Sequence, residues 1–343
     1  MDRPAGSFDS RRNKLGSLAS RIRIRPVVAS AVATGIAAIA VLVIARITGA
    51  DAVGRAFDHF QPAWIGLIAG AELLAYPAYA LAYRTLANMR GRSVALPLVA
   101  RLVVAGFGPF AIGGGFGIDR KYLEALHQDE RSARVTVIAL GTLEWAVLAP
   151  TTCVVSIVFL ATGANILPSL LWPWALAVPA GFAVGLWLSE PQRLERFAWL
   201  RKGRWRRMIA HLLEGMSVLH ELGRSPLRYA GAWLGTALYW AADIAAFYGG
   251  LRTFGLDPNA GKVILAYATG YAATRRSLPL GGAGVTEFLM TYSLYWVREP
   301  LAPALAAVVA YRIFNFVLAA TPALIAHRQL DPLIGRHRSS EAS

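Results

Sequence analysis

Six apolar runs, each about twenty residues or longer and separated by charged segments, constrain this chain more than any other feature. A run of that length crosses the roughly 30 Å hydrocarbon core of a bilayer as one helix. The runs cover residues 27–48, 63–83, 134–162, 167–188, 229–251 and 302–326. Of the 343 residues, only 16% are charged, against about 25% in soluble domains. The sequence therefore predicts an all-α polytopic membrane protein, and it excludes a soluble enzyme and a disulfide-stapled secreted domain.

Two further apolar stretches, 95–117 and 262–297, are interrupted by proline and glycine. Pro109 breaks the first stretch and Pro279 the second, and each lies beside a cluster of glycines. Broken backbone at membrane depth is tolerated only where protein or a water-filled cavity surrounds the freed polar groups. We therefore expect two broken or re-entrant hairpins in addition to about six full transmembrane helices.

The glycine clusters of the two hairpins share the same spacing. The first-hairpin glycines are Gly114, Gly115 and Gly117, and the matching residues of the second hairpin are Gly281, Gly282 and Gly284. Interrupted segments at corresponding places in two halves are typical of transporters built as inverted repeats, and they mark the binding site. The alternative interpretation is that these glycines only let helices pack closely.

Basic residues gather in alternate loops. The net charge is +15, and 26 of the 35 Lys and Arg residues fall in segments 1–26, 84–94, 118–134, 189–229 and 327–343. In a soluble protein this charge would suggest nucleic acid as a partner, but the segregation follows the positive-inside rule. If the N-terminus lies in the cytoplasm and the chain crosses the membrane six times, all five basic segments and both termini lie in the cytoplasm. We expect a multi-pass protein of the plasma (inner) membrane that binds no nucleic acid.

The same pattern divides the chain into two membrane halves. The expected parts are a basic cytoplasmic leader 1–26, a half 27–188 with the first hairpin, a cytoplasmic linker 189–228, a half 229–326 with the second hairpin, and a cytoplasmic tail 327–343.

The linker carries an amphipathic pattern. Its apolar positions are Met208, Ile209, Leu212, Leu213, Met216 and Leu219, and they follow the basic residues Arg201, Lys202, Arg204, Arg206 and Arg207. This pattern is typical of an interfacial helix that binds membrane lipids of an anionic leaflet through 189–229. Docking of a partner protein is the alternative.

Eight charged residues fall within the apolar runs and hairpins. They are Glu72, Arg101, Glu144, Asp243, Arg275, Arg276, Glu287 and Arg312. Each would cost about 2.5–3.5 kcal/mol at a lipid-facing helix centre, so we expect them to pair or to line a polar cavity. Buried ion pairs are the favoured interpretation for Glu72 and Asp243. Arg101 can instead extend to the headgroups.

Arg275 and Arg276 stand just before the break at Pro279, where a helix restarts. A helix N-terminus binds phosphate through its free N–H groups and dipole, and Arg binds phosphate oxygens bidentately. The alternative is that both arginines anchor the hairpin to outer headgroups. The expected lipid-phosphate site comprises Arg275, Arg276, Gly281, Gly282, Gly284 and Arg101.

Glu144, Glu287 and Arg312 are expected to act in gating or coupling. The matched glycines of the two hairpins are 167 residues apart, and adding this repeat offset to position 144 gives 311, next to Arg312, so we expect the two charges at near-equivalent depths in the repeat. We predict an ion pair between Glu144 and Arg312.

The run SLPLGGAGVTEF, followed by AYRIFNF, resembles the flippase-like integral membrane family that includes the transmembrane region of lysylphosphatidylglycerol synthases. The residues that carry the resemblance are Pro279, Gly281, Gly282, Gly284, Val285, Glu287, Tyr311 and Arg312, with Leu280 where a Gly can stand, and Glu144 matches an acidic position of the family. The first hairpin departs from the family, because it reads GGGFGIDRKYL where many relatives carry a P-x-R-x-G-E type sequence. The sequence has no segment that resembles the soluble aminoacyl-transferring domain of the full-length synthases, so we expect a flippase-like protein and not aminoacylation of lipid.

Motifs for catalysis, a metal or a cofactor are not found in the sequence. It has neither HExxH nor a nucleotide-binding P-loop, and its single cysteine, Cys153, lies in an apolar run. We expect a non-enzymatic protein that translocates or binds an anionic phospholipid or polyprenyl-phosphate-linked lipid without its own nucleotide motor. The alternatives are a membrane-embedded headgroup transferase using Asp119 and Asp129, and a scaffold for a lipid-modifying partner.

Overall fold

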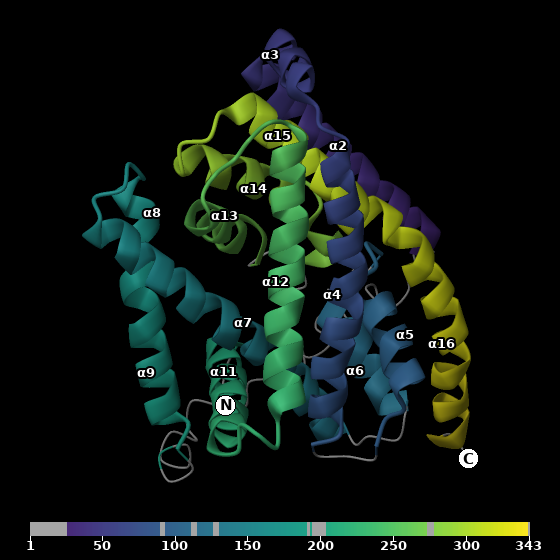
Figure 1. Ribbon diagram of the computed structural model, residues 1–343. Helices are drawn as coiled ribbons and strands as arrows, with labels where there is room; N and C mark the ends of the chain where they lie inside the picture. The colour runs from purple at the N-terminus through teal and green to yellow at the C-terminus, as the bar shows by residue number, and fades with distance from the viewer. Residues whose placement is uncertain are drawn as a thin grey trace, which may run out of the picture.

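A computed structural model describes residues 26–89, 93–110, 115–125, 130–190, 193, 204–272 and 278–341. These residues form helices and no strand, which confirms the all-α polytopic fold (Figure 1). Five of the described helices are long and apolar enough to cross a membrane. The first three are Pro26–Thr48 (α2), Ala63–Ala87 (α4) and Ser132–Ala161, which lies within α7 (Glu130–Ala161). The fourth, Pro168–Leu188, runs from α8 (Pro168–Trp172) to the end of α9 (Val178–Leu188). The fifth, Leu301–Pro332, begins with α15 (Leu301–Arg312) and continues into α16 (Ala320–Glu341).

The sixth expected span, 229–251, corresponds to α12 (Ala230–Thr253). This helix of 24 residues is long enough to cross a bilayer, but it falls outside the five because its sequence is less apolar. Its buried residues include Asp243, Tyr239 and Trp240. α12 and α4 lie side by side through the height of the molecule (Figure 1), so the polar residues of α12 face protein instead of lipid.

Both interrupted stretches form pairs of short helices. The first comprises α5 (Leu96–Gly106) and α6 (Gly115–Ala125), so its second helix continues beyond the expected end at 117. The second comprises α13 (Ala260–Tyr267) and α14 (Val285–Trp296). α5 and α6 lie at the lower end of the molecule and α13 and α14 in its upper half (Figure 1). The two pairs therefore approach the middle from opposite ends.

The turns of the two pairs meet inside the bundle. The described part of the first turn is residues 107–110, and the described part of the second is residues 278–284. A Cβ added to Gly281 would lie 3.8 Å from the Cα of Pro109. Phe110 of the first turn and Leu280 of the second share a small apolar cluster with residues of α2 and α16. Each helix pair is interrupted at its proline and glycine residues, and the interrupted segments are the ones that approach each other.

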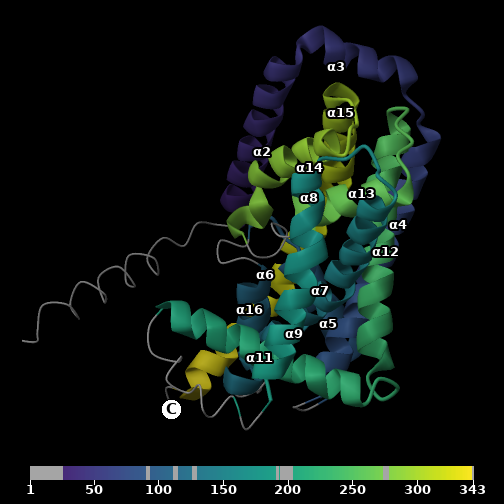
Figure 2. The same cartoon turned by 90° about the vertical axis from the view of Figure 1, so that its left-hand side faces the viewer.

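The linker residues 204–224 form helix α11 (Arg204–Arg224), which lies across the lower end of the molecule (Figure 2). Its apolar residues Leu213 and Leu219 are buried, and the helix packs against α7 and α9. Leu212 remains 58% exposed. The expected amphipathic helix is present, and much of its apolar face is covered by protein. Residues 201 and 202, and the side chains at 204–208, lie outside the described part.

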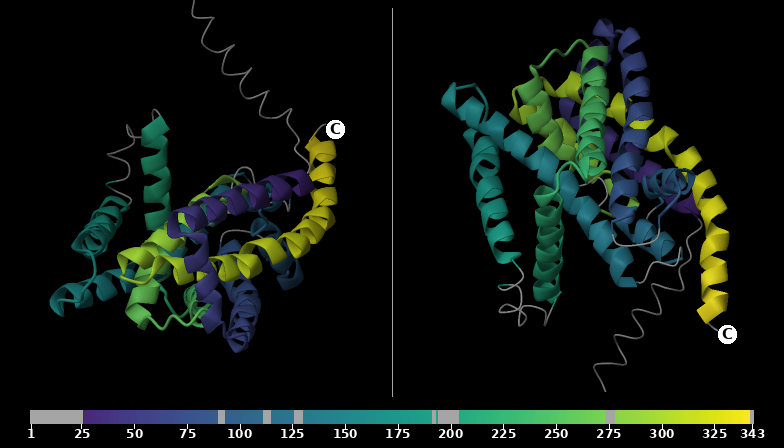
Figure 3. Two further views of the ribbon diagram at one scale, coloured as in Figure 1. Left: turned by 90° about the horizontal axis from the view of Figure 1, so that it is seen from above. Right: turned by 60° about the horizontal axis from the view of Figure 1, so that its bottom comes forward.

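The remaining described elements complete the periphery. α3 (Ala50–Ala56) and the short segment Phe57–His59 join α2 to α4 at the upper end. α9 and α16 lie at opposite edges of the molecule (Figure 3). The largest fully buried side chains include Tyr79, Tyr239, Tyr267, Tyr271 and Tyr311, so the centre of the bundle is rich in aromatic hydroxyl groups.

Candidate functional site

The second turn adopts a backbone conformation that requires glycine. Its φ angles are 54° at Leu280, 62° at Gly281, 71° at Gly282 and 82° at Gly284. Side-chain-bearing residues avoid this left-handed region at a cost of about 1–2 kcal/mol, whereas Gly adopts it freely. Leu280 is the exception, and its packing in the cluster with Phe110 offsets part of that cost. The conformation explains why a Gly can stand at position 280 in the family pattern.

The matched glycines of the first hairpin serve a different purpose. Gly115 begins α6, and Gly117 lies within that helix with nothing within 4 Å of an added Cβ. At Gly281 an added Cβ would lie 3.0 Å from the Phe316 ring. The similarity in spacing therefore does not carry over to backbone conformation at these positions.

We expect Gly281→Ala to lower the free energy of unfolding by about 1–2 kcal/mol, because Ala is strained at positive φ. Gly117→Ala is the matched control, and it should be neutral or stabilise by up to about 1 kcal/mol through helix propensity. Denaturation of the purified protein in detergent measures both. Equal effects at the two positions would contradict this account of the turn.

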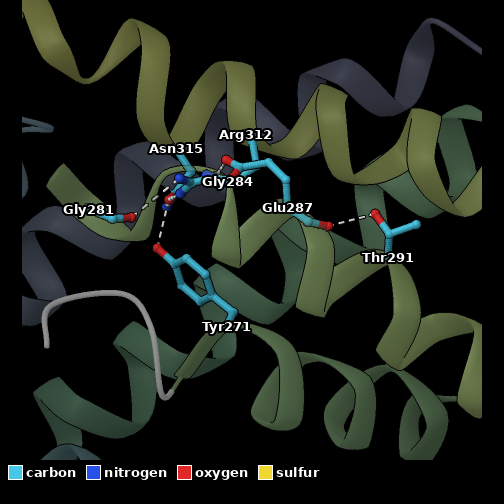
Figure 4. A network of polar contacts seen from close by, with 7 residues as sticks. All are labelled: Tyr271, Gly281, Gly284, Glu287, Thr291, Arg312 and Asn315. Atoms are coloured by element: carbon cyan, nitrogen blue, oxygen red, sulfur yellow. Dashed lines mark hydrogen bonds and ion pairs between the residues drawn. The ribbon is translucent and has the colours of Figure 1, made fainter. Parts of the chain in front are cut away.

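Glu287 joins the start of α14 to Arg312 on α15. One carboxylate oxygen, Oε2, accepts a hydrogen bond from the backbone N–H of Gly284 at 2.6 Å. The other, Oε1, accepts from Arg312 Nε at 2.6 Å, and the side chains are 2% and 6% exposed (Figure 4). A carboxylate at this position satisfies a free N–H of the helix and complements its dipole. Glu287 therefore occupies the position at the N-terminus of α14 that an external anion would take at an uncapped helix.

The guanidinium of Arg312 is held against the second turn. Its Nη2 donates to the carbonyl oxygen of Gly281 and its Nη1 to Oδ1 of Asn315, both at 3.4 Å. The guanidinium carbon also lies 4.2 Å from the centre of the Phe316 ring. These contacts orient a buried cation next to the glycines of the family pattern.

Two π-helical segments supply the neighbours of Arg312. Tyr271 lies in η4 (Ala268–Ala272) and Asn315 in η6 (Ile313–Leu318). The Tyr271 hydroxyl donates to Asn315 Oδ1 at 2.7 Å, and Asn315 Nδ2 donates to Glu72 Oε1 at 2.9 Å. Single π-helical turns occur frequently at functional sites. The sequence interpretation missed both residues, although Asn315 lies within the AYRIFNF run.

Asp243 is surrounded by tyrosine hydroxyls. Tyr239, Tyr267 and Tyr311 donate to its carboxylate at 2.5, 2.7 and 2.5 Å. Asp243 is 0% exposed. The favoured interpretation of Asp243 as half of a buried ion pair is wrong, because these three neutral donors provide its contacts within the described residues.

The predicted ion pair between Glu144 and Arg312 is also wrong. Arg312 pairs with Glu287, while Glu144 accepts a hydrogen bond from the Tyr79 hydroxyl. The indole N–H of Trp240 donates to the backbone oxygen of Glu144 at 2.9 Å. The repeat offset related positions in the sequence, but it did not determine which helix faces meet. α14 packs directly on α15, and this contact brings Glu287 to Arg312.

The other expected site residues are placed as follows. Arg101 is exposed on α5. Gly282 is buried within the second turn. Asp119 is buried on α6. Arg275, Arg276, Gly114 and Asp129 lie outside the described residues.

Fold and site together define a polytopic α-helical membrane protein with a buried polar site where two broken helix pairs meet. Residues 27–323 match the family described as the lysylphosphatidylglycerol synthase transmembrane region. The chain belongs to this family, as the resemblance at the second turn implied. A comparison with curated proteins gave no match.

Proposed function

We propose that this protein moves an anionic phospholipid or a polyprenyl-phosphate-linked lipid between the leaflets of the plasma membrane, without a nucleotide motor of its own. The observation that carries the proposal is the buried guanidinium of Arg312 at the meeting point of two oppositely directed helix pairs. Transporters with inverted repeats bind substrate near the midplane, at discontinuous helices. Membership of a lipid-related family supports the same function.

The site offers a mechanism for binding a phosphate. Glu287 holds both the N-terminus of α14 and Arg312, and a lipid phosphate would compete with this carboxylate for the same donors. Arg275 and Arg276 stand just before the turn in sequence and would bind the phosphate as it approaches. Arg101 would contact headgroups from the other hairpin. Breaking the Glu287–Arg312 pair would then accompany movement of two re-entrant hairpins.

A leaflet-resolved lipid assay tests this function. Purified protein in liposomes should move fluorescent phosphatidylglycerol between leaflets, and Arg275→Gln or Arg276→Gln should each slow it about tenfold or more. A hydrogen bond to a charged group contributes about 1.5–3 kcal/mol, and 1.4 kcal/mol is a factor of ten. Arg298→Gln, at the exposed far end of α14, is the matched control. Normal lipid movement in a variant with both arginines replaced would mean that they only anchor the hairpin to headgroups. A covalent change of the lipid headgroup without movement between leaflets would indicate a transferase.

We further propose that both termini face the cytoplasm and that α11 binds the anionic cytoplasmic leaflet, as the basic segments imply. A cysteine at Ser340 should then be protected from an impermeant external reagent, and one at Ala260 should react. Ala260 is exposed and avoids Asn259, whose side chain caps α13. Cys153, which is buried, is replaced by Ala as background. External labelling of position 340 would reverse the orientation.

A further inference from the structure

Asp243 and its three tyrosines form a second polar centre that the lipid-phosphate site does not use. We propose that Asp243 binds a proton, and that uptake of this proton accompanies binding of the anionic lipid. This inference rests on the proposed function for the coupling, but proton binding itself can be measured without any lipid movement.

The contacts of Asp243 identify it as a carboxylate that is balanced by hydrogen bonds and not by a cation. Removing a carboxylate from water costs several kcal/mol, and short hydrogen bonds to an ionised acceptor offset part of that cost. All three donors are neutral hydroxyls, and the donor distances are 2.5–2.7 Å. The negative charge at this position can therefore be removed by a proton without leaving an unpaired buried cation.

The three donors come from different helices. Tyr239 lies on α12 with Asp243, Tyr267 ends α13 in the second helix pair, and Tyr311 lies on α15 directly before Arg312. A proton added to one carboxylate oxygen converts it into an O–H donor. Oδ2 accepts from both Tyr239 and Tyr267, so a proton on this oxygen leaves room for one of them, and the other must become an acceptor or lose its hydrogen bond. Where Tyr267 is displaced, protonation would loosen the attachment of the second helix pair to α12.

Charge balance connects this proton to the lipid. Arg312 follows Tyr311, which donates to Asp243, and it forms a neutral pair with Glu287. In this proposal a phosphate that binds at the pair adds its own negative charge to the same buried region. Two ligands of opposite charge in one low-dielectric region strengthen each other's binding, and the effect is reciprocal. One proton with one singly charged lipid also crosses the membrane without net charge.

Other ionisable groups lie on the helices around Asp243, and their titration signals must be distinguished from the signal of Asp243. Among the described residues, the buried acidic, basic and tyrosine side chains on the elements packed against α12 are Glu72, Tyr79 and Tyr83 on α4, Glu144 on α7, Tyr267 on α13, and Tyr311 and Arg312 on α15.

Infrared titration of the purified protein tests proton binding directly. The wild type should show a protonated-carboxyl band that appears as the pH falls and is lost in Asp243→Asn. Asp58→Asn, an exposed acid at the upper end, is the matched control and should keep the band. If Asp243→Asn fails to fold, Tyr267→Phe replaces it. This variant removes one hydrogen-bond donor to the carboxylate and should change the pH dependence of the band. A band unchanged by these substitutions, or one that responds to sodium and not to pH, would overturn the proposal.

Coupling is tested in liposomes with the membrane potential clamped by potassium and valinomycin. A gradient of one pH unit should drive an approximately tenfold difference of fluorescent phosphatidylglycerol between leaflets, as expected for one proton per lipid. Asp243→Asn should lose this dependence while lipid still equilibrates. Wild-type movement that ignores the gradient would refute the coupling. Absence of any movement would refute the proposed function and leave the infrared result to decide proton binding.

Discussion

Arg312→Gln is expected to lower the free energy of unfolding by about 3–5 kcal/mol, the largest effect of any single change considered for this protein. The substitution leaves Glu287 as a buried carboxylate without its cation, and breaking a buried pair costs about this much. Lipid movement should be lost as well, because the guanidinium that lies against the second turn is removed. Denaturation in detergent and the leaflet-resolved assay measure the two effects.

A double-mutant cycle separates the ion pair from the other contacts of Arg312. Glu287→Gln keeps an acceptor for the Gly284 N–H, so the start of α14 should survive. The double variant Glu287→Gln with Arg312→Gln should be more stable than Arg312→Gln alone, since no unpaired charge remains. Arg120→Gln, which breaks an exposed pair with Glu124, should change stability by less than about 1 kcal/mol. Strictly additive effects at 287 and 312 would show that their charges do not interact.

Gly235→Ala is expected to lower the free energy of unfolding by about 1–3 kcal/mol, the usual range for adding an atom to a packed core. The new Cβ would lie 2.6 Å from the backbone oxygen of Ala78 and 2.6 Å from the backbone nitrogen of Ala82. Backbone atoms cannot rotate away, so α4 and α12 must separate. Because Asp243 lies two turns further along α12, the dependence of lipid movement on the pH gradient should also weaken.

Gly231→Ala, one turn earlier on α12, is the matched control. Its new Cβ would lie 2.6 Å from Oγ1 of Thr85, a small side chain at an exposed position that can change rotamer. Helix propensity favours both substitutions equally, so the difference between them isolates the backbone clash. A thermal-unfolding comparison in one detergent is sufficient. Equal stability of the two variants would mean that α4 and α12 are not in close contact.

The buried site differs from the phosphate site expected at the second turn in one chemical respect. The N-terminus of α14 and Arg312 are already bound by an internal carboxylate. Any anionic ligand must therefore displace Glu287 or bind beside it. If the proposed function holds, this exchange would couple phosphate binding to the Glu287–Arg312 pair, which is why Glu287, Asp243 and Arg312 need to be tested together.

Much of the architecture could be predicted from the sequence. The runs that form α2, α4, α7, α9 and α15 are recognisable because crossing a bilayer depends on length and on the transfer free energy of each residue, which are local properties. The helix breaks could be predicted for the same reason, since Pro109 and Pro279 act on the backbone at their own positions. Glu287 follows Gly284 by three residues, a spacing that suits a cap at a helix start.

The partners of the buried charges could not be predicted in this way. Glu72, Glu144, Asp243, Glu287 and Arg312 were all recognisable as charges at membrane depth, but only the packing of α14 on α15 assigns Arg312 to Glu287. Two of the three donors to Asp243 come from other helices, and the π-helical segments that present Tyr271 and Asn315 were not apparent in the sequence. The sequence by itself therefore determined which segments are long and apolar enough to cross a membrane, where the helices break, and which buried charges must be satisfied. Tertiary structure alone decided which groups satisfy them, because hydrogen bonds and ion pairs depend on which faces of distant helices meet.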